Sequence, residues 1–238
     1  KHRRLDKGQL FILNGHTADK LSVYNWNALW SDTQLFEMED LDGDGTLDWG
    51  QYGKRKDDGR LQWVVKKGHD KRGVIRIFSW PAGLDEAKPM LVNDMTGDGI
   101  KEVAVTGRVG SNKLVLRIND GRMPNQRIAN HSWSGVWTNE SIVELGDLTK
   151  DGISEVALLG KSNNSHYYQI AVNNGADSTE ISRIWLLEDW VELEIESYDV
   201  NQDNIEDIII NGITTSPLTR KVTILNGEDF SQLYETTF

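Results

Sequence analysis

The chain has 238 residues, no cysteine and a net charge of −11 at neutral pH. The lack of cysteine excludes a disulfide-braced scaffold, and no apolar run is long enough for a transmembrane helix, so we expect no membrane insertion. The excess of acidic residues argues against a nucleic-acid partner.

The first predicted elements are two strands within residues 10–32, where the apolar run Phe11–Leu13 is followed by Gly15. Short segments rich in β-branched residues and bounded by Gly, Asn or Asp continue to the end of the chain. They predict about four strands in each of the stretches 33–86, 87–139, 140–190 and 191–238. No segment keeps a helical period over three turns.

Three series of residues recur with the same period as these stretches, which is typical of a repeat protein. One series stands 14 residues before an acidic loop: Trp26, Trp80, Trp133 and Trp185. A second stands 13 residues after the start of that loop: Gly53, Gly107, Gly160 and Gly212. A third follows short apolar runs: Gly15, Gly68, Gly121, Gly175 and Gly227.

The acidic loops are the most informative repeat. Each has nine residues, and their first residues lie 54, 53 and 52 positions apart. Oxygen-bearing side chains at positions 1, 3, 5 and 9, with a backbone carbonyl at position 7, are the ligands that Ca²⁺ prefers. The candidate ligands are Asp40, Asp42, Asp44, Thr46 and Asp48; Asp94, Thr96, Asp98, Ile100 and Glu102; Asp147, Thr149, Asp151, Ile153 and Glu155; and Asp199, Asn201, Asp203, Ile205 and Asp207.

The alternative to calcium-binding loops is that the Asp-Gly pairs form ordinary turns between strands. A turn alone, however, does not require a further carboxylate at position 9. The loops also differ from a helix-loop-helix hand, which needs Glu at position 12. There the chain has Gln51, Val105, Leu158 and Ile210, which we expect inside strands. We therefore predict about four structural Ca²⁺ ions. Loop one carries four carboxylates and each other loop three, so it is expected to bind most tightly.

The loops and the glycine that follows each of them resemble the FG-GAP and VCBS repeats of integrin alpha-subunit heads and of many secreted bacterial proteins. The resemblance implies an all-β fold, a β-propeller whose acidic loops join blade strands 1 and 2 and hold Ca²⁺ on one face. Loop four has Asn204 where the others have Gly, which is compatible because Asn adopts the left-handed conformation. The apolar second residue of each loop is expected to point into its blade.

On this basis residues 1–238 form a single propeller array. It consists of a half-blade (1–32) and four complete blades (33–86, 87–139, 140–190 and 191–238). Because the half-blade lacks its first two strands, we expect the array to be part of a larger ring, supplied by further blades of a longer chain or by self-association. The alternative is a small ring that a partner completes.

Two groups of tryptophan have different expected roles. The in-phase series is expected to pack between blades. Trp30, Trp137 and Trp190 are expected in the connections from strand 4 to the next strand 1, beside basic strand 2–3 hairpins. The basic residues of those hairpins are Lys54, Arg55, Lys56, Arg60, Arg108, Lys113, Lys161, His166, Arg220 and Lys221.

Aromatic platforms ringed by cations suit sugars or acidic glycans. Trp30, Trp137, Trp190, Arg108 and Lys161 are therefore the candidate ligand residues, the alternative being that charged hairpin tips are simply solvated. The five histidines have no metal-ligand spacing, and we expect them at the surface.

The sequence best fits a calcium-stabilised binding or adhesion module that presents propeller loops to a glycan or protein. The alternatives are a propeller of a secreted carbohydrate-active enzyme resembling a polysaccharide lyase, and an architectural spacer of a surface protein. We expect no catalytic residue, because the sequence has no nucleophile elbow and no phosphate loop. Cytosolic calcium is too low for modest sites, which favours the cell exterior, the cell surface or the periplasm.

Overall fold

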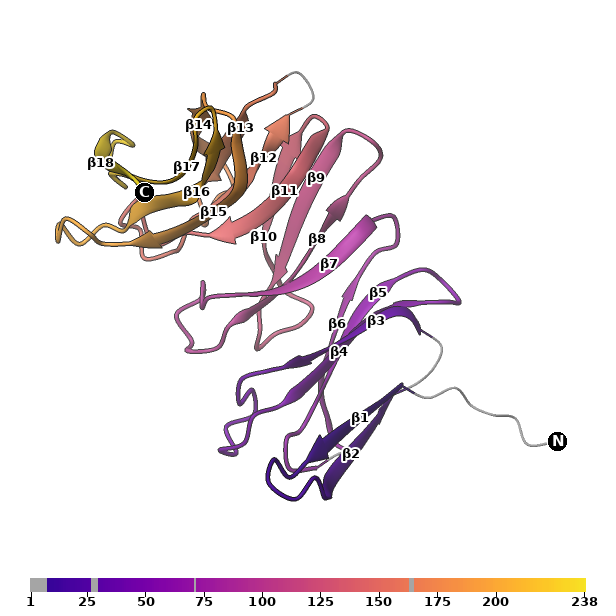
Figure 1. Ribbon diagram of the computed structural model, residues 1–238. Helices are drawn as coiled ribbons and strands as arrows, with labels where there is room; N and C mark the ends of the chain where they lie inside the picture. The colour runs from indigo at the N-terminus through magenta and orange to yellow at the C-terminus, as the bar shows by residue number, and fades with distance from the viewer. Residues whose placement is uncertain (1–7, 27–29, 71, 163–164) are drawn as a thin grey trace. The chain divides into compact units, whose positions relative to one another are not determined.

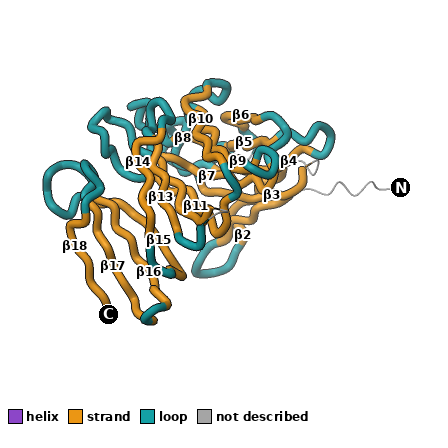
Figure 2. Tube along the Cα trace, turned by 90° about the horizontal axis from the view of Figure 1, so that it is seen from above, coloured by secondary structure: helices purple, strands orange, loops and turns teal. Residues whose placement is uncertain are grey.

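The computed structural model describes residues 8–26, 30–70, 72–162 and 165–238, and every regular element in these ranges is a β-strand (Figures 1 and 2). No helix in the described ranges is long and apolar enough to cross a membrane. The first sheet has two strands, β1 (Gly8–Leu13) and β2 (Lys20–Trp26).

Each of the other four sheets takes four strands in chain order. The first contains β3 (Trp30–Glu37), β4 (Trp49–Arg55), β5 (Leu61–Lys66) and β6 (Val74–Trp80). The second contains β7 (Asp85–Val92), β8 (Glu102–Arg108), β9 (Lys113–Asn119) and β10 (Arg127–Ser134). The third contains β11 (Trp137–Glu144), β12 (Val156–Ser162), β13 (Tyr168–Asn173) and β14 (Glu180–Leu186). The fourth contains β15 (Trp190–Tyr198), β16 (Asp207–Thr215), β17 (Leu218–Leu225) and β18 (Gln232–Thr237).

The strand order confirms the predicted fold class. Each complete sheet is an antiparallel meander, the organisation of a propeller blade, and β1 and β2 supply the half-blade. The first strand of each blade begins one to three residues earlier than the predicted boundary, for example at Trp137 rather than at residue 140. Of the predicted half-blade, residues 1–7 and 27–29 lie outside the described residues.

The chain divides into two compact units. One comprises residues up to Leu84 together with Asn119–Arg127, and the other comprises Asp85–Ile118 with Ile128–Phe238. In the first unit the core is aromatic: the rings of Phe36 and Trp63 lie 4.9 Å apart. In the second unit the core is mostly aliphatic, as where Ile170 and Ile208 are buried in one cluster. Burial of such side chains is the main force that holds each unit together.

The second glycine series is explained by tryptophan packing. A Cβ at Gly53 would lie 2.9 Å from Cε3 of Trp30, one at Gly160 3.2 Å from Cε3 of Trp137, and one at Gly212 3.0 Å from Cε3 of Trp190. These tryptophans begin β3, β11 and β15, and they do not lie in the connections as expected. Glycine is required at these positions because only a residue without a side chain leaves room for the indole ring.

Three of the four in-phase tryptophans are buried, as the predicted packing between blades requires. Trp26, Trp80 and Trp133 are buried, but Trp185 is 50% exposed, so the prediction is wrong there. In β14 the next residue, Leu186, is buried instead and pairs with Tyr168. Because neighbouring residues of a strand point to opposite faces, a register difference of one residue turns Trp185 outward.

The first strand of every complete blade contains a bulge that the sequence analysis missed. The pairing register shifts within β3, β7, β11 and β15. A residue other than glycine has positive φ at each shift: Asp32 (53°), Glu86 (52°), Asn139 (51°) and Glu192 (50°). Such bulges bend a strand and redirect its side chains.

Candidate calcium sites

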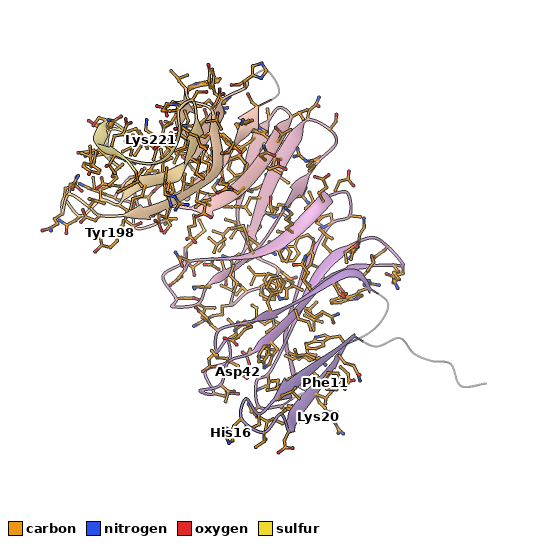
Figure 3. The ribbon with its side chains drawn as sticks, viewed as in Figure 1. Phe11, His16, Lys20, Asp42, Tyr198 and Lys221 are labelled. Atoms are coloured by element: carbon orange, nitrogen blue, oxygen red, sulfur yellow. The ribbon has the colours of Figure 1, made fainter. Side chains whose placement is uncertain are left out.

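The acidic loops lie where they were expected. They connect β3 to β4, β7 to β8, β11 to β12 and β15 to β16, the first and second strands of each blade. Asp42, for example, lies in the loop between β3 and β4 (Figure 3). The residues at position 12 lie inside β4, β8, β12 and β16, which confirms that the loops are not helix-loop-helix hands.

The first Asp of each loop organises the turn. In loop one the Asp40 carboxylate accepts hydrogen bonds from the backbone N–H groups of Gly43, Asp44 and Gly45, at 2.7–3.0 Å. The first Asp of every other loop accepts the equivalent bonds from positions 5 and 6. These amides, the Gly45 amide above all, lower the pKa of Asp40. The loop backbone is therefore shaped by its own side chains around a carboxylate that stays ionised.

Two loop positions need a left-handed backbone. Position 6 has φ of 86° at Gly45 and 67° at Asn204, which confirms that Asn takes the role of glycine in loop four. Position 4 also has positive φ, including at Lys150 (60°) and Gln202 (64°). The sequence analysis did not foresee position 4, because Lys and Gln are not typical of this conformation.

The carboxylate at position 9 is the most deeply placed ligand candidate. Asp48, Glu102, Glu155 and Asp207 are all 0% exposed. Each accepts a hydrogen bond from the N–H of position 2, as in the 2.8 Å bond from Leu41 to Asp48. Burial raises the pKa of Asp48 and of Glu155. A buried carboxylate next to other carboxylates is costly without a compensating cation.

Two loops bring three carboxylates together. Oxygen atoms of Asp40, Asp42 and Asp48 lie within 4.8 Å of one another, as do those of Asp147, Asp151 and Glu155. Among the described residues, loops two and four do not bring three such groups this close. All the donor atoms are carboxylate oxygens, so loops one and three fit a hard cation such as Ca²⁺.

Loop one also faces basic side chains from its own blade. The Lys67 ammonium lies 2.6 Å from Oδ2 of Asp42, and His69 Nδ1 contacts Asp44. Both come from the hairpin between β5 and β6. In loop three the equivalent hairpin instead supplies the neutral amide of Asn174, 3.1 Å from Oδ2 of Asp151. The expectation that loop one binds calcium most tightly considered only its carboxylates and omitted the competing ammonium.

The apolar second residue of each loop behaves as predicted in three blades. Leu41, Met95 and Leu148 are buried and anchor their loops. Val200 is exposed, so the prediction is wrong for loop four. Loop four is instead anchored by Ile205, which is buried in the hydrophobic core, and by polar contacts such as the 3.1 Å bond from the Gly227 N–H to Asp207.

The third glycine series lets the β-hairpin between strands 3 and 4 approach the acidic loop. A Cβ at Gly68, Gly175 or Gly227 would lie 2.0–2.1 Å from the carbonyl oxygen of loop position 8. That distance is far below van der Waals contact, so a side chain here would separate the hairpin from the loop. These glycines are therefore needed for the close contact between the hairpin and the acidic loop, and not because their own turn requires a particular backbone conformation.

We expect Gly175→Ala to destabilise the protein by about 3 kcal/mol, because its Cβ would overlap the Ser154 carbonyl, which is backbone and cannot move aside cheaply. Gly15→Ala is the matched control: Gly15 holds the same place in the half-blade, where a Cβ would meet nothing within 4 Å. Urea unfolding of both variants measures the difference. Equal midpoints would show that the close approach has no energetic role.

The predicted ligand surface needs correction. Trp137 and Trp190 are buried, so they do not form an exposed aromatic platform. Trp30 is half-buried against Gly53. Lys161 lies over the ring of Tyr168, with Nζ 4.7 Å from the centroid. Arg108 forms ion pairs with Glu86 and Glu140.

Other predicted surface residues are also engaged. Lys221 is buried and lies 2.6 Å from Glu188 and 2.9 Å from Glu235 (Figure 3). His131 is 0% exposed, which corrects the expectation that all histidines lie at the surface. Neither of its ring nitrogens has a hydrogen-bond partner among the described residues.

No family model matches the sequence, and no curated protein matches it. Among solved structures the chain is similar to the Dos1 propeller, with 13% identity over 96% of this chain and 50% of that chain and a TM-score of 0.46. It is also similar to BBS1N, solved in complex with ARL6DN, with 12% identity over 87% of this chain and 58% of that chain and a TM-score of 0.40. The chain thus spans only half to three fifths of these structures. At this level of similarity the function of neither protein extends to this chain.

Proposed function

We propose that the chain is a calcium-stabilised binding module of an extracellular or periplasmic protein, whose blades present loops to a glycan or protein ligand. The observation that carries the proposal is the carboxylate at position 9. All four are fully buried, and each is tied by hydrogen bonds to an acidic loop that contains at least two further carboxylates. Where such carboxylates lie together, as in loops one and three, a cation is needed to offset their repulsion.

The role of the cation is structural in this proposal. The loop joins the first two strands of a blade, and its position-9 carboxylate also accepts bonds from the hairpin between strands 3 and 4, as in the 2.8 Å bond from Gly68 to Asp48. A cation on the loop therefore holds together both connections at one end of the strands. The strand 2–3 hairpins lie at the opposite end of the strands, where they do not take part in cation binding and are available to a ligand.

The direct test is calorimetric titration of the chelator-treated chain with calcium chloride. We expect saturable binding with dissociation constants of about 10⁻⁵–10⁻³ M and loss of one binding event in Asp151→Asn. Asp177→Asn is the matched control, since Asp177 lies on a nearby hairpin outside the carboxylate cluster. Absence of calcium binding in the wild-type chain would refute the proposal.

The same titration ranks the loops. We expect Lys67→Gln to strengthen calcium binding about tenfold, because removing the ammonium beside Asp42 frees that carboxylate for the cation. Lys150→Gln is the control, because Lys150 belongs to loop three and forms no ion pair within the described residues. If Lys67→Gln left every dissociation constant unchanged, the ammonium would not compete with the cation.

A further inference from the structure

The second compact unit contains a cavity outside the acidic loops. Its volume is about 280 Å³, and it is lined by residues of β7, β8 and the middle of β11, together with one residue of β9. Its apolar lining comes from Pro89, Met90, Leu114 and Ile142. The lining also includes Gly107 and two residues with hydroxyl groups, Thr106 and Ser141.

The cavity coincides with a break in the repeat. In the blades that contain Gly53, Gly160 and Gly212, each glycine packs beneath the tryptophan that begins the first strand. In the blade of Gly107 the pairing of Asp85 with Arg108 places Leu84 at the position that those tryptophans occupy. Gly107 lines the cavity instead.

The charged part of the lining is balanced. Arg108 is only 16% exposed, and its Nε donates to Oε2 of Glu86 at 3.0 Å. Its Nη2 donates to the carbonyl of Trp137 at 2.9 Å and to the carboxylate of Glu140. Of the five N–H groups of an arginine, these bonds use three, which leaves those on Nη1 to donate to a ligand. Lys88 adds the second cation, so two cations face two carboxylates.

Two strand bulges frame the charged residues. Glu86 is itself the left-handed residue of the β7 bulge (φ 52°), and Asn139 (φ 51°) precedes Glu140 in β11. A left-handed backbone at such residues costs free energy, on the order of 1 kcal/mol each. Here the bulges place both carboxylates against Arg108.

We propose that this cavity binds a single uncharged sugar ring, the terminal residue of a neutral glycan. The proposal rests on the binding function above and specifies its ligand. A sugar ring has an apolar C–H face, which fits the apolar lining, and hydroxyl groups that both donate and accept. Arg108 supplies donors, Glu140 supplies acceptors, and the Ser141 hydroxyl supplies both; the Thr106 hydroxyl, which already donates to the Val115 carbonyl at 3.1 Å, supplies an acceptor. The volume, just below the range of about 300–1,000 Å³ for drug-sized ligands, suits one ring.

The charge balance selects against acidic glycans. In the lining Arg108 and Lys88 already balance Glu86 and Glu140, so a uronate would bring a third carboxylate and leave the cavity with an excess of negative charge. Like charges at such distances repel. The sequence-based expectation of sugars or acidic glycans is therefore narrowed to neutral sugars.

The test is a ¹H–¹⁵N NMR titration of the calcium-loaded full chain. The probes are the methyl glycosides of glucose, galactose and mannose, with methyl glucuronoside as the charged counterpart. We expect at least one neutral glycoside to shift the Arg108 Nε–H and Ser141 amide signals with a dissociation constant of about 1–10 mM, as suits a ligand of this size. The glucuronoside is expected to bind at least tenfold more weakly.

Two variants locate the binding. Ser141→Trp fills the cavity from an exposed position and is expected to abolish the shifts. Gln34→Trp is the control, because Gln34 is the exposed residue at the same place after the bulge of β3. Melting temperatures of both variants verify that they fold.

Several outcomes would overturn the proposal: no shift with any neutral glycoside, shifts that persist in Ser141→Trp, or tighter binding of the glucuronoside. Shifts produced only by N-acetylphenylalaninamide would assign the cavity to an aromatic side chain of a protein partner instead. The calcium titration is read independently, because the cavity contains no loop carboxylate. Failure to bind sugar therefore stays distinguishable from failure to bind calcium.

Discussion

Removal of calcium by excess EGTA is expected to lower the midpoint of thermal unfolding by about 5–10 °C for each site that is saturated a hundredfold over its dissociation constant. At that excess a bound ligand contributes about 2.7 kcal/mol, and 1 kcal/mol corresponds to about 2–4 °C for a chain of this size. The physical reason is the buried position-9 carboxylate. Without the cation, the fully buried Glu155 and the nearby, more exposed Asp147 and Asp151 repel one another.

The measurement is differential scanning calorimetry in 1 mM calcium and in EGTA, with magnesium at the same ionic strength as the control. Magnesium demands a smaller octahedral cage and is expected to restore little of the lost stability. The variant Asp147→Asn should reduce the difference between the two buffers, since it removes one ligand of loop three. Superimposable melting curves, or anomalous scattering that detects no ion at Asp40, Asp42 and Asp48, would refute the calcium sites.

The acidic loops could be predicted from sequence because their structure is determined locally. Each hydrogen bond of Asp40 goes to an amide within five residues. The turn therefore depends on a short run of residue types rather than on the rest of the fold. The strand order was predictable for a related reason, since antiparallel meanders join neighbouring segments by short connections.

The environment of the loops could not be predicted in the same way. Lys67 reaches Asp42 from a hairpin 25 residues further along the chain, and nothing in the loop motif indicates an ammonium there. The glycine series at Gly68 and Gly175 was visible, but its cause, close approach to a loop carbonyl, depends on how the sheet folds back on itself. Spacing reveals that a residue is required without revealing what it touches.

Burial was the least predictable property. Trp185 and Leu186 are neighbours in the sequence, and a shift of one residue in strand register decides which of them is buried. Trp137 was expected at a surface, yet Gly160 of the adjacent strand accommodates its ring. The bulge residues were missed although Asp32, Glu86 and Asn139 each stand eight residues before an acidic loop, because no single residue type marks their backbone conformation.

The second large effect is expected from His131→Phe, which should remove a loss of stability in acid. His131 lies in β10, and its ring stacks on that of Trp133 with centroids 6.0 Å apart. Burial lowers the pKa of His131 from its usual value of 6.5 to about 4, and the attraction of Asp177 offsets this only in part. The charged imidazolium is disfavoured because neither ring nitrogen has a hydrogen-bond partner in the described part of the chain.

The sign of the pH effect follows from the direction of this shift. The unfolded chain binds a proton at His131 near pH 6.5, whereas the folded chain binds it only near pH 4. His131 therefore does not change the free energy of unfolding above about pH 6.5. As the pH falls below that value, His131 lowers the free energy of unfolding, and the loss is complete near pH 4. A difference of this size corresponds to about 3 kcal/mol of unfolding free energy.

Urea unfolding of the wild type and of His131→Phe at several pH values between 4 and 7 isolates this contribution. Loop carboxylates titrate in both proteins, so their effect cancels when the two free energies are subtracted. We expect the variant to be within about 1.5 kcal/mol of the wild type at pH 7, as for other swaps of similar volume, and to gain about 3 kcal/mol relative to it by pH 4. If the curves for His131→Phe and the wild type ran parallel, a hydrogen-bond partner or water would have to reach the ring. The acid sensitivity of the chain would then belong to its carboxylates alone.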